Sequence, residues 1–246
     1  MQLPTQFLAL SALVGLSAAH GFVQQLKVGN DYVTTWNPYK DPQKKLERIT
    51  RTFKDNGPIT DGDYTGPNIT CNTGGNIPTS LTTLVPAGSK VSFLWTEWES
   101  DHPGPIMTYM ARCPGKCSAF AANSGNIWFK IDQSGYDASF AVPWASKRLY
   151  TQNSTWTVTI PKSIASGEYI LRHEILGLQR AAKSGLAQFY PACHQVTVTG
   201  GGTASPKGVA LPGAYALDDP GILLEYRDIS ATKLYTPPGG PVYRDP

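Results

Sequence analysis

The stretch Thr155-Trp156-Thr157-Val158-Thr159-Ile160, which ends at Pro161, decides the fold class. Polar and apolar residues alternate through it without a break, and its β-branched and aromatic side chains favour extended backbone. Period-two alternation places the apolar side chains on one face, so we predict a β-strand that is buried on one side only. Strands of this kind form antiparallel sheets that cover a core.

Outward from this strand, five further segments are rich in β-branched or aromatic residues and are separated by Gly, Pro or Asn. They are residues 91–98, 106–111, 127–132, 169–176 and 195–199. Only 142–150 and 178–184 are expected to hold short helical turns. The chain of 246 residues contains 24 Gly and 20 Pro, which indicates many turns and ordered loops. We therefore predict an all-β fold, an immunoglobulin-like or fibronectin-like antiparallel β-sandwich with long loops and few short helices.

The chain begins with a predicted secretory signal peptide, residues 1–19. Residues 7–17 form an apolar run too short to span a bilayer, and Ser17-Ala18-Ala19 supplies the small residues of a cleavage site. The alternative is a buried apolar segment that leaves His20 internal. Residues 20–246 are expected to form one domain, because the tail after the Gly-rich stretch 200–206 is too short to build a core and should fold back.

Charge and hydropathy exclude two classes of partner. The formal net charge is only +3, and no basic stripe interleaves with aromatic residues, so nucleic acid is not expected. No later segment is apolar enough to cross a membrane, so we expect a secreted, extracellular monomer.

The four cysteines of a secreted chain imply two disulfides, which can pair in three ways. Spacing favours a tight Cys113–Cys117 loop and a long-range Cys71–Cys193 bridge, and the oxidising compartment makes a metal site on Cys113 and Cys117 a poor alternative. N-glycosylation sequences at Asn68 and Asn153 agree with secretion.

Cleavage after Ala19 would make His20 the first residue, with a free α-amino group. The amine and the ring Nδ1 of a terminal histidine can chelate one ion, because their unperturbed pKa values of about 8 and 6.5 leave little proton affinity to displace near neutral pH. An internal histidine lacks the amine, so the cut itself would create the metal ligand.

Three further histidines have competing interpretations. His102, in Asp101-His102-Pro103-Gly104-Pro105, lies in a restricted loop and is either a ligand or an ordinary solvated residue. His173 shares a strand face with apolar residues, which is typical of a core histidine. His194 alternates with valines and is expected to be structural. Gln188 and Tyr190 share one face of an extended segment.

Several motifs, in order along the chain, together carry a resemblance to a known family. They are His20, His102-Pro103-Gly104-Pro105, residues 107–113 and 128–132, Leu171-Arg172-His173-Glu174-Ile175, Gln188-Phe189-Tyr190-Pro191-Ala192-Cys193, and residues 211–215 and 219–223. The chain resembles the fungal lytic polysaccharide monooxygenases of auxiliary activity family 9, copper enzymes that cleave cellulose. The motifs span nearly all of residues 20–246, and no appended carbohydrate-binding module is expected.

The resemblance implies a copper site. One copper ion would be held by the amine and ring of His20 and by the ring of His102, with Tyr190 near the axial position. His173 and Gln188 would hydrogen-bond an oxygen species beside the metal. Nitrogen ligands without thiolate suit Cu(II), whereas zinc on the same ligands has no redox chemistry.

The resemblance also implies a reaction and a substrate surface. Glycosidic bonds of cellulose, and of related β-1,4-glucans, would break after hydrogen abstraction at carbon 1 or carbon 4, with dioxygen or hydrogen peroxide and a small-molecule or protein electron donor. Surface tyrosines would stack on sugar rings. Tyr235 is the strongest candidate, followed by Tyr32, Tyr39 and Tyr243, and for each the alternative is a tyrosine packed on its own domain.

Three stretches depart from the family pattern, namely the charged insert 40–53, Thr236-Pro237-Pro238, and His194 after Cys193. Two other functions remain open. A non-catalytic copper-binding protein could use the same histidines, and a hydrolase could use the carboxylates Glu97, Glu99 and Asp101.

Overall fold

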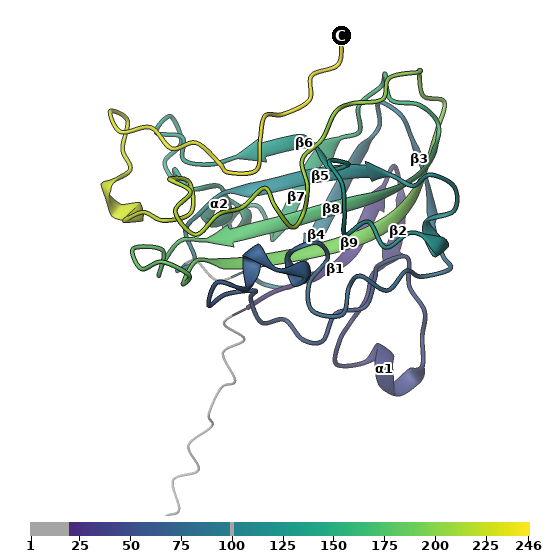
Figure 1. Ribbon diagram of the computed structural model, residues 1–246, viewed down its shortest axis with the longest axis horizontal. Helices are drawn as coiled ribbons and strands as arrows, with labels where there is room; N and C mark the ends of the chain where they lie inside the picture. Colours follow the sequence, from purple (N-terminus) through teal and green to yellow (C-terminus); the bar gives the residue numbers. More distant parts are fainter. Residues whose placement is uncertain (1–19, 99–100) are drawn as a thin grey trace, which may run out of the picture.

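The computed structural model describes residues 20–98 and 101–246 as a sandwich of two β-sheets (Figure 1). The four-stranded sheet has the order β2-β1-β4-β7 and the five-stranded sheet the order β3-β9-β8-β5-β6. The strands are β1 Val23–Val28, β2 Asp31–Thr34, β3 Thr83–Pro86, β4 Lys90–Trp95, β5 Ile106–Arg112, β6 Phe129–Ser134, β7 Thr155–Thr159, β8 Gly167–Gly177 and β9 Gln188–Thr199. The short helices are α1 Asp41–Lys44, α2 Ala145–Thr151, η1 Asp63–Thr65, η2 Pro67–Ile69, η3 Cys117–Ala119 and η4 Tyr226–Asp228.

The sandwich and its six predicted strands are confirmed, with one difference in strand direction. β7 covers the alternating stretch that begins at Thr155, and it pairs antiparallel with β4. β3 instead pairs parallel with β9, so the five-stranded sheet is mixed rather than wholly antiparallel. β3 is an edge strand of four residues, and nothing in so short a run specifies its direction.

β1 was not predicted because its alternation is interrupted. Its pairing with β4 shifts register between Val23 and Gln25, and such a bulge moves the following side chains to the opposite face. Val23, Leu26 and Val28 are therefore buried at uneven spacing. The period-two test fails for β1, although the strand forms the centre of its sheet.

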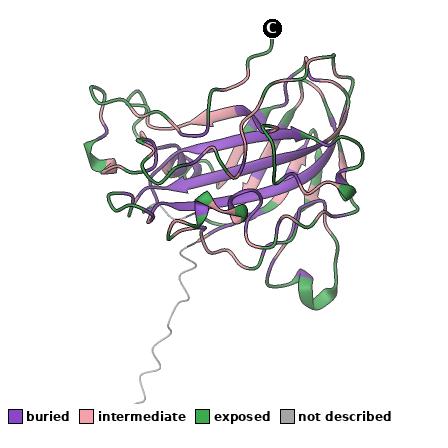
Figure 2. Ribbon diagram, in the orientation of Figure 1, coloured by how far each residue is buried: buried purple, intermediate pink, exposed green. Residues whose placement is uncertain are grey.

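The core has two layers, one on each face of the five-stranded sheet, whose central strands are coloured as buried in Figure 2. Between the sheets lie residues such as Phe93, Leu171 and Tyr190. On the outer face, Tyr109 packs against Tyr215 of the C-terminal segment, so the tail folds back over the sheet as expected. Because both faces are covered, the central strands β8 and β9 are buried along most of their length.

The outer layer contains a buried ion pair between Arg172 and Glu174, both fully buried. The hydroxyl group of Tyr215 also donates a hydrogen bond to Glu174. Breaking such a pair leaves an uncompensated buried charge, at a cost of about 3–5 kcal/mol. The hydrogen bond from Tyr215 to Glu174 therefore joins the C-terminal segment to this pair on β8.

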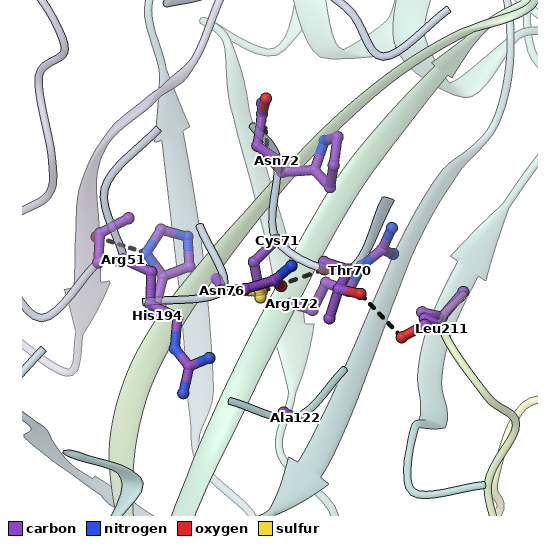
Figure 3. Close-up of a disulfide and its surroundings, with 12 residues drawn as sticks. Arg51, Thr70, Cys71, Asn72, Asn76, Ala122, Arg172, His194 and Leu211 are labelled. Atoms are coloured by element: carbon purple, nitrogen blue, oxygen red, sulfur yellow. Dashed lines mark hydrogen bonds between the residues drawn. A yellow bond between two sulfur atoms is a disulfide. The ribbon is translucent and has the colours of Figure 1, made fainter. Parts of the chain in front are cut away.

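Both disulfides have the pairing favoured by the sequence. Cys113 is bridged to Cys117, at a sequence separation of 4, and Cys71 to Cys193, at a separation of 122. The long bridge ties the 57–79 loop to β9, and Figure 3 shows Thr70 next to it, with its hydroxyl group donating to the Leu211 carbonyl at 2.8 Å. Constraint of the unfolded chain by so long a loop stabilises the fold by about 4–5 kcal/mol.

One end of the sandwich gathers the ends of five strands, and we call it the site end. There β1 begins at Val23, opposite the last residue of β4, Trp95. β8 ends at Gly177, which is paired with Gln188 at the start of β9, and β5 begins nearby. Loops that enter and leave these strands therefore lie together although they are distant in sequence.

Two predictions concern the N-terminal and membrane-related features. The signal peptide predicted for residues 1–19 lies outside the described residues. Among residues 20–98 and 101–246, no helix has the length and apolar character needed to cross a bilayer.

Candidate metal centre

His20 lies at the site end, immediately before β1. The side-chain amide of Asn56 donates a hydrogen bond to the His20 carbonyl at 2.6 Å. Two hydrogen bonds fix the chain at Phe22. The Phe22 amide donates to the Thr96 hydroxyl at 3.1 Å, and the Thr96 amide donates to the Phe22 carbonyl at 2.9 Å. His20 is thus held by the end of β4 and by the 54–57 loop.

The loop that carries His102 is clamped to the end of β8. The Leu178 amide donates to the Pro103 carbonyl at 2.8 Å, and the Ser146 hydroxyl donates to the His102 carbonyl at 2.6 Å. Gly104 has φ +158°, and a Cβ there would lie 1.8 Å from the Leu176 carbonyl oxygen, so no other residue allows this close approach. The predicted restricted loop is therefore rigid for identifiable reasons.

These two loops bring the rings of His20 and His102 together. Their centroids are 5.5 Å apart and the planes are nearly perpendicular, at 86°. The Tyr190 ring lies 5.5 Å from His20 and 6.2 Å from His102. Beneath them lies the fully buried Trp98, whose ring is 5.0 Å from Tyr190 and 5.8 Å from His102.

Asp101 fixes the orientation of the His102 ring. Its Oδ1 lies 2.5 Å from Nδ1 of His102, so Nδ1 is engaged and Nε2 is the nitrogen left to bind a ligand. The Asp101 side chain is 77% exposed, whereas His102 is 6% exposed. Asp101 thus orients a histidine. Of the carboxylates Glu97, Glu99 and Asp101 considered for a hydrolase, Glu99 lies outside the described residues.

Gln188 and Tyr190 both lie at the start of β9 and face this cluster. The Tyr190 hydroxyl donates to Oε1 of Gln188 at 2.8 Å, and Nε2 of Gln179 donates to the same oxygen. Burial, together with the negative charge of Asp101, raises the pKa of Tyr190. The Tyr190 phenol therefore stays protonated and remains a donor.

The structure does not bring His173 to the cluster. This fully buried ring stacks on Phe93 at 3.8 Å, and its Nδ1 bonds the Thr108 hydroxyl at 2.8 Å. His173 lies on the face of β8 that points between the sheets, so strand geometry overrides the role implied by the resemblance. It is a core histidine, the alternative interpretation of the sequence, and Gln179 takes the place beside Gln188.

The four candidate surface tyrosines divide into two groups. Tyr39 is 53% exposed, and its hydroxyl lies 2.5 Å from Oδ1 of Asn56, the residue that binds His20. Tyr235 lies near the end of β6, with its ring 5.0 Å from Trp144 and its hydroxyl bonded to the Gly221 carbonyl at 2.7 Å. Both are thus associated with the site end, although Tyr235 packs mainly on its own domain.

Tyr32 and Tyr243 lie at the opposite end of the sandwich. Tyr32 pairs with Lys27, about 13 Å along β1 from Val23 at the site end. Tyr243 packs on Phe129, and its hydroxyl bonds Ser163. The prediction that these two tyrosines contact the same substrate surface as His20 is not compatible with their positions.

The remaining sequence candidates lie away from the cluster. Asn153 is exposed with φ +54°, and Asn68 is half-buried in η2. His194 is fully buried and bonded to the Thr50 hydroxyl at 2.8 Å, as expected of a structural residue. The insert 40–53 contains α1, and Asp41 and Arg48 form an ion pair of 3.0 Å within it.

The sequence alone missed Trp98, Asn56 and Gln179, and it did not assign Asp101 to His102. Adjacency to His102 was a usable signal for Asp101. Gln179 and Asn56 lie in loops without any recognisable pattern, and only the pairing of Gly177 with Gln188 reveals that Gln179 is close to the site.

The chain is thus a β-sandwich with two histidines and a tyrosine gathered at its rim, and comparisons with known proteins identify the family. The model of Auxiliary Activity family 9, formerly GH61, matches residues 20–235. The chain is 44% identical to AA9 family lytic polysaccharide monooxygenase C of Geotrichum candidum, over 99% of this chain and 45% of that protein. It is 43% identical to AA9 family lytic polysaccharide monooxygenase A of Gloeophyllum trabeum, over 96% of this chain and 76% of that protein.

Solved structures agree. The extended catalytic domain of H. jecorina LPMO9A matches with a TM-score of 0.83 and 31% identity, over 91% of this chain and 90% of that one. Cel61B from Hypocrea jecorina, a glycoside hydrolase family 61 member, also gives 0.83, with 33% identity over 91% and 100%. The chain belongs to Auxiliary Activity family 9, whose members matched here are named lytic polysaccharide monooxygenases, which are oxidoreductases. It spans less than half the length of the Geotrichum candidum relative.

The residues at the site end fit copper. Within the described part of the chain, no three His, Cys, Asp or Glu side chains gather as a metal-binding group. The cluster offers two imidazoles, and a third nitrogen would come from the α-amino group of a chain that starts at His20. A set of nitrogen donors without thiolate favours Cu(II) among divalent first-row metals.

Proposed function

We propose that this chain is a copper-dependent lytic polysaccharide monooxygenase, secreted after cleavage before His20. The observation that carries the proposal is the perpendicular approach of the His20 and His102 rings, 5.5 Å apart, beside Tyr190. The amine and ring of His20 and Nε2 of His102 would hold one copper ion, with Tyr190 beside it. The bound copper would supply one-electron redox chemistry toward dioxygen or hydrogen peroxide.

The side chains around the metal would orient ligands and control protons. Asp101 holds the His102 ring so that Nε2 is the free nitrogen. Gln188 would donate a hydrogen bond to an oxygen molecule at the open side of the site. The raised pKa of Tyr190 keeps the phenol neutral, which favours its role as a weak, uncharged neighbour of the metal rather than a phenolate ligand.

We infer that the substrate is cellulose or a related β-1,4-glucan, oxidised at carbon 1 or carbon 4 of the glycosidic link. Tyr39 supports this inference, because an exposed aromatic ring connected to His20 through Asn56 could stack on a sugar of a chain lying across the site. A small-molecule or protein donor would supply electrons. We further propose one domain over residues 20–246, a monomeric state and glycans on Asn68 and Asn153.

A matched pair of proteins tests the proposed function. One starts at His20, and the other retains Ala19, which leaves every side chain in place but displaces the α-amino group. We expect the first to bind copper tightly and to release oxidised oligosaccharides from cellulose with a reductant, and the second to lose at least about a hundredfold in copper affinity.

Product analysis by mass spectrometry separates the remaining outcomes. Tight copper binding without oxidised sugars from any glucan would favour a non-catalytic copper protein. Unoxidised products that a copper chelator does not suppress would indicate a hydrolase. Equal copper affinity of the two proteins would overturn the role of the terminal amine.

A further inference from the structure

The side chain of Gln179 folds back over the end of β8 to reach Gln188. Gly177, the last residue of β8, is the pairing partner of Gln188, and Gln179 follows two residues later. From there Nε2 of Gln179 donates a hydrogen bond to Oε1 of Gln188. The contact therefore joins the second residue after β8 to the first residue of β9.

Gly177 leaves the space that this contact needs. A Cβ at Gly177 would lie 2.6 Å from Oε1 and 3.4 Å from Nε2 of Gln179. Because Gly177 has no positive φ, alanine suits its backbone, and the effect of such a change would fall on the Gln179 carboxamide. The missing side chain at Gly177 thus seats the amide of Gln179 against Gln188.

Oε1 of Gln188 accepts from two donors, Gln179 and the Tyr190 hydroxyl at 2.8 Å. This arrangement determines which way the Gln188 amide faces. With the Gln179 amide in its observed orientation, a reversed Gln188 amide would direct N–H groups at Nε2 of Gln179, which is itself a donor. In the observed orientation, Nε2 of Gln188 has no protein acceptor among the residues that the structure describes, and Gln188 keeps 8% of its surface exposed.

We propose that Gln179 is a positioning residue, which fixes the Gln188 carboxamide so that its N–H groups, rather than its oxygen, face the candidate metal site. The orientation of Gln188 does not depend on the proposed function. What rests on the proposed function is that these N–H groups face an oxygen species or an anion bound to copper. Oε1 of Gln179 is buried without a partner, which is the cost of this orientation. The hydrogen bond of the Gln179 side chain goes to Gln188 and not to His20, His102 or Tyr190, so Gln179 acts through Gln188.

Two variants of the secreted protein test the orientation after the metal has been removed with a chelator. Gln179→Met keeps the length of the side chain without the donor. Gly177→Ala displaces the donor and changes neither glutamine. The measurement is the ¹³Cδ resonance of Gln188, which is assigned by its disappearance in Gln188→Leu. This resonance moves upfield when the carbonyl oxygen of the side chain loses a hydrogen bond. We expect an upfield shift in both variants.

Gln179→Glu adds a readout that a packing role would not produce. A protonated carboxyl donates to Oε1 of Gln188, whereas the ionised carboxylate only accepts. The Gln188 resonance of this variant should return toward the wild-type value as pH falls through the carboxyl pKa. The variant is compared with wild type at each pH, so that pH effects shared by the two proteins cancel.

With copper bound, azide affinity measures the donor that Gln188 presents. We expect Gln179→Met to weaken azide binding about tenfold, the value of one hydrogen bond to a charged group. Gln152→Met, an exposed glutamine after α2, is the matched control and should change neither readout. An unchanged Gln188 resonance in Gln179→Met and Gly177→Ala would overturn the proposal. Expected resonance shifts in a protein that binds no copper would support the orientation and refute the proposed function.

Discussion

The four histidines form two pairs, one at the rim of the sandwich and one in its core. His20 and His102 meet at the site end with perpendicular rings, and Nε2 of His102 remains available for a ligand. His173 and His194 both lie fully buried next to Phe93, with centroids 3.8 and 5.8 Å from its ring. In each core histidine a threonine hydroxyl binds Nδ1, and Nε2 is buried without a partner.

The comparison teaches that the surroundings, and not the residue type, decide what an imidazole can do. Burial lowers the pKa of His194 to about 3 and that of His173 well below its usual value, so both are neutral and inaccessible to a metal. His102 has a carboxylate on one nitrogen and access on the other. The two pairs should therefore respond in opposite ways to substitution.

Replacement of His102 by alanine should have the largest effect on metal binding. Loss of one of three nitrogen donors is expected to lower copper affinity about a thousandfold, equal to about 4 kcal/mol. Isothermal titration against a competing chelator measures the affinity. Stability of the metal-free protein in urea should change by only about 1 kcal/mol, since the ring lies at the rim. A copper affinity equal to that of wild type in this variant would contradict the distinction between the rim pair and the core pair of histidines.

Replacement of His173 by alanine should have the reverse effect. The cavity beside Phe93 and the unpaired Thr108 hydroxyl are expected to lower the free energy of unfolding by about 3 kcal/mol. Urea denaturation measures it, and copper affinity should stay within about threefold of wild type. A selective loss of oxidised product, with stability retained, would return His173 to the site.

The core pair should also make stability depend on pH. Because His194 has a lower pKa when folded than when unfolded, the unfolded chain takes up the proton first, and stability is lost as pH falls from about 6.5 toward about 3. Substitution by glutamine should reduce this slope by up to about 1.4 kcal/mol per pH unit. The slope from denaturation at several pH values checks this, and an unchanged slope would mean that His194 is accessible to protons.

Replacement of Asp101 by asparagine should have the smallest effect and would sharpen the description of the rim pair. The carboxylate orients His102 but is 77% exposed, so copper affinity should fall less than about tenfold. Titration at low and high salt measures the effect, which should shrink as salt screens the charge. A loss as large as that of His102→Ala would make Asp101 a ligand rather than an orienting group.

The sequence predicts those features that local pattern controls. β7 follows from its alternation, and α2 lies within the predicted segment 142–150 apart from its last residue. The bulge in β1 hides a central strand, and the parallel pairing of β3 depends on β9, which lies more than a hundred residues away. Pairing between distant segments is a property of the whole chain, and no local window contains it.

The residues of the candidate site also differ in whether a local sequence motif predicts their position in the structure. Motifs identified His20, His102, Gln188 and Tyr190, and the structure brings all four together. His173 belongs to a motif too, but the direction of its side chain is set by the alternation of β8, which points it between the sheets. A motif thus indicated which residues to consider, while strand geometry decided whether they could reach the site.

Because the ends of the strands gather at one edge of the sandwich, folding and metal binding must occur in a fixed order. Donors from the start of β1, the loop before β5 and the start of β9 meet only after both sheets have paired, so the metal cannot nucleate folding as zinc does in a zinc finger. A topology with so many non-local pairings folds slowly compared with helical domains. We expect the metal-free chain to fold by itself, with copper acquired last, after the cut before His20.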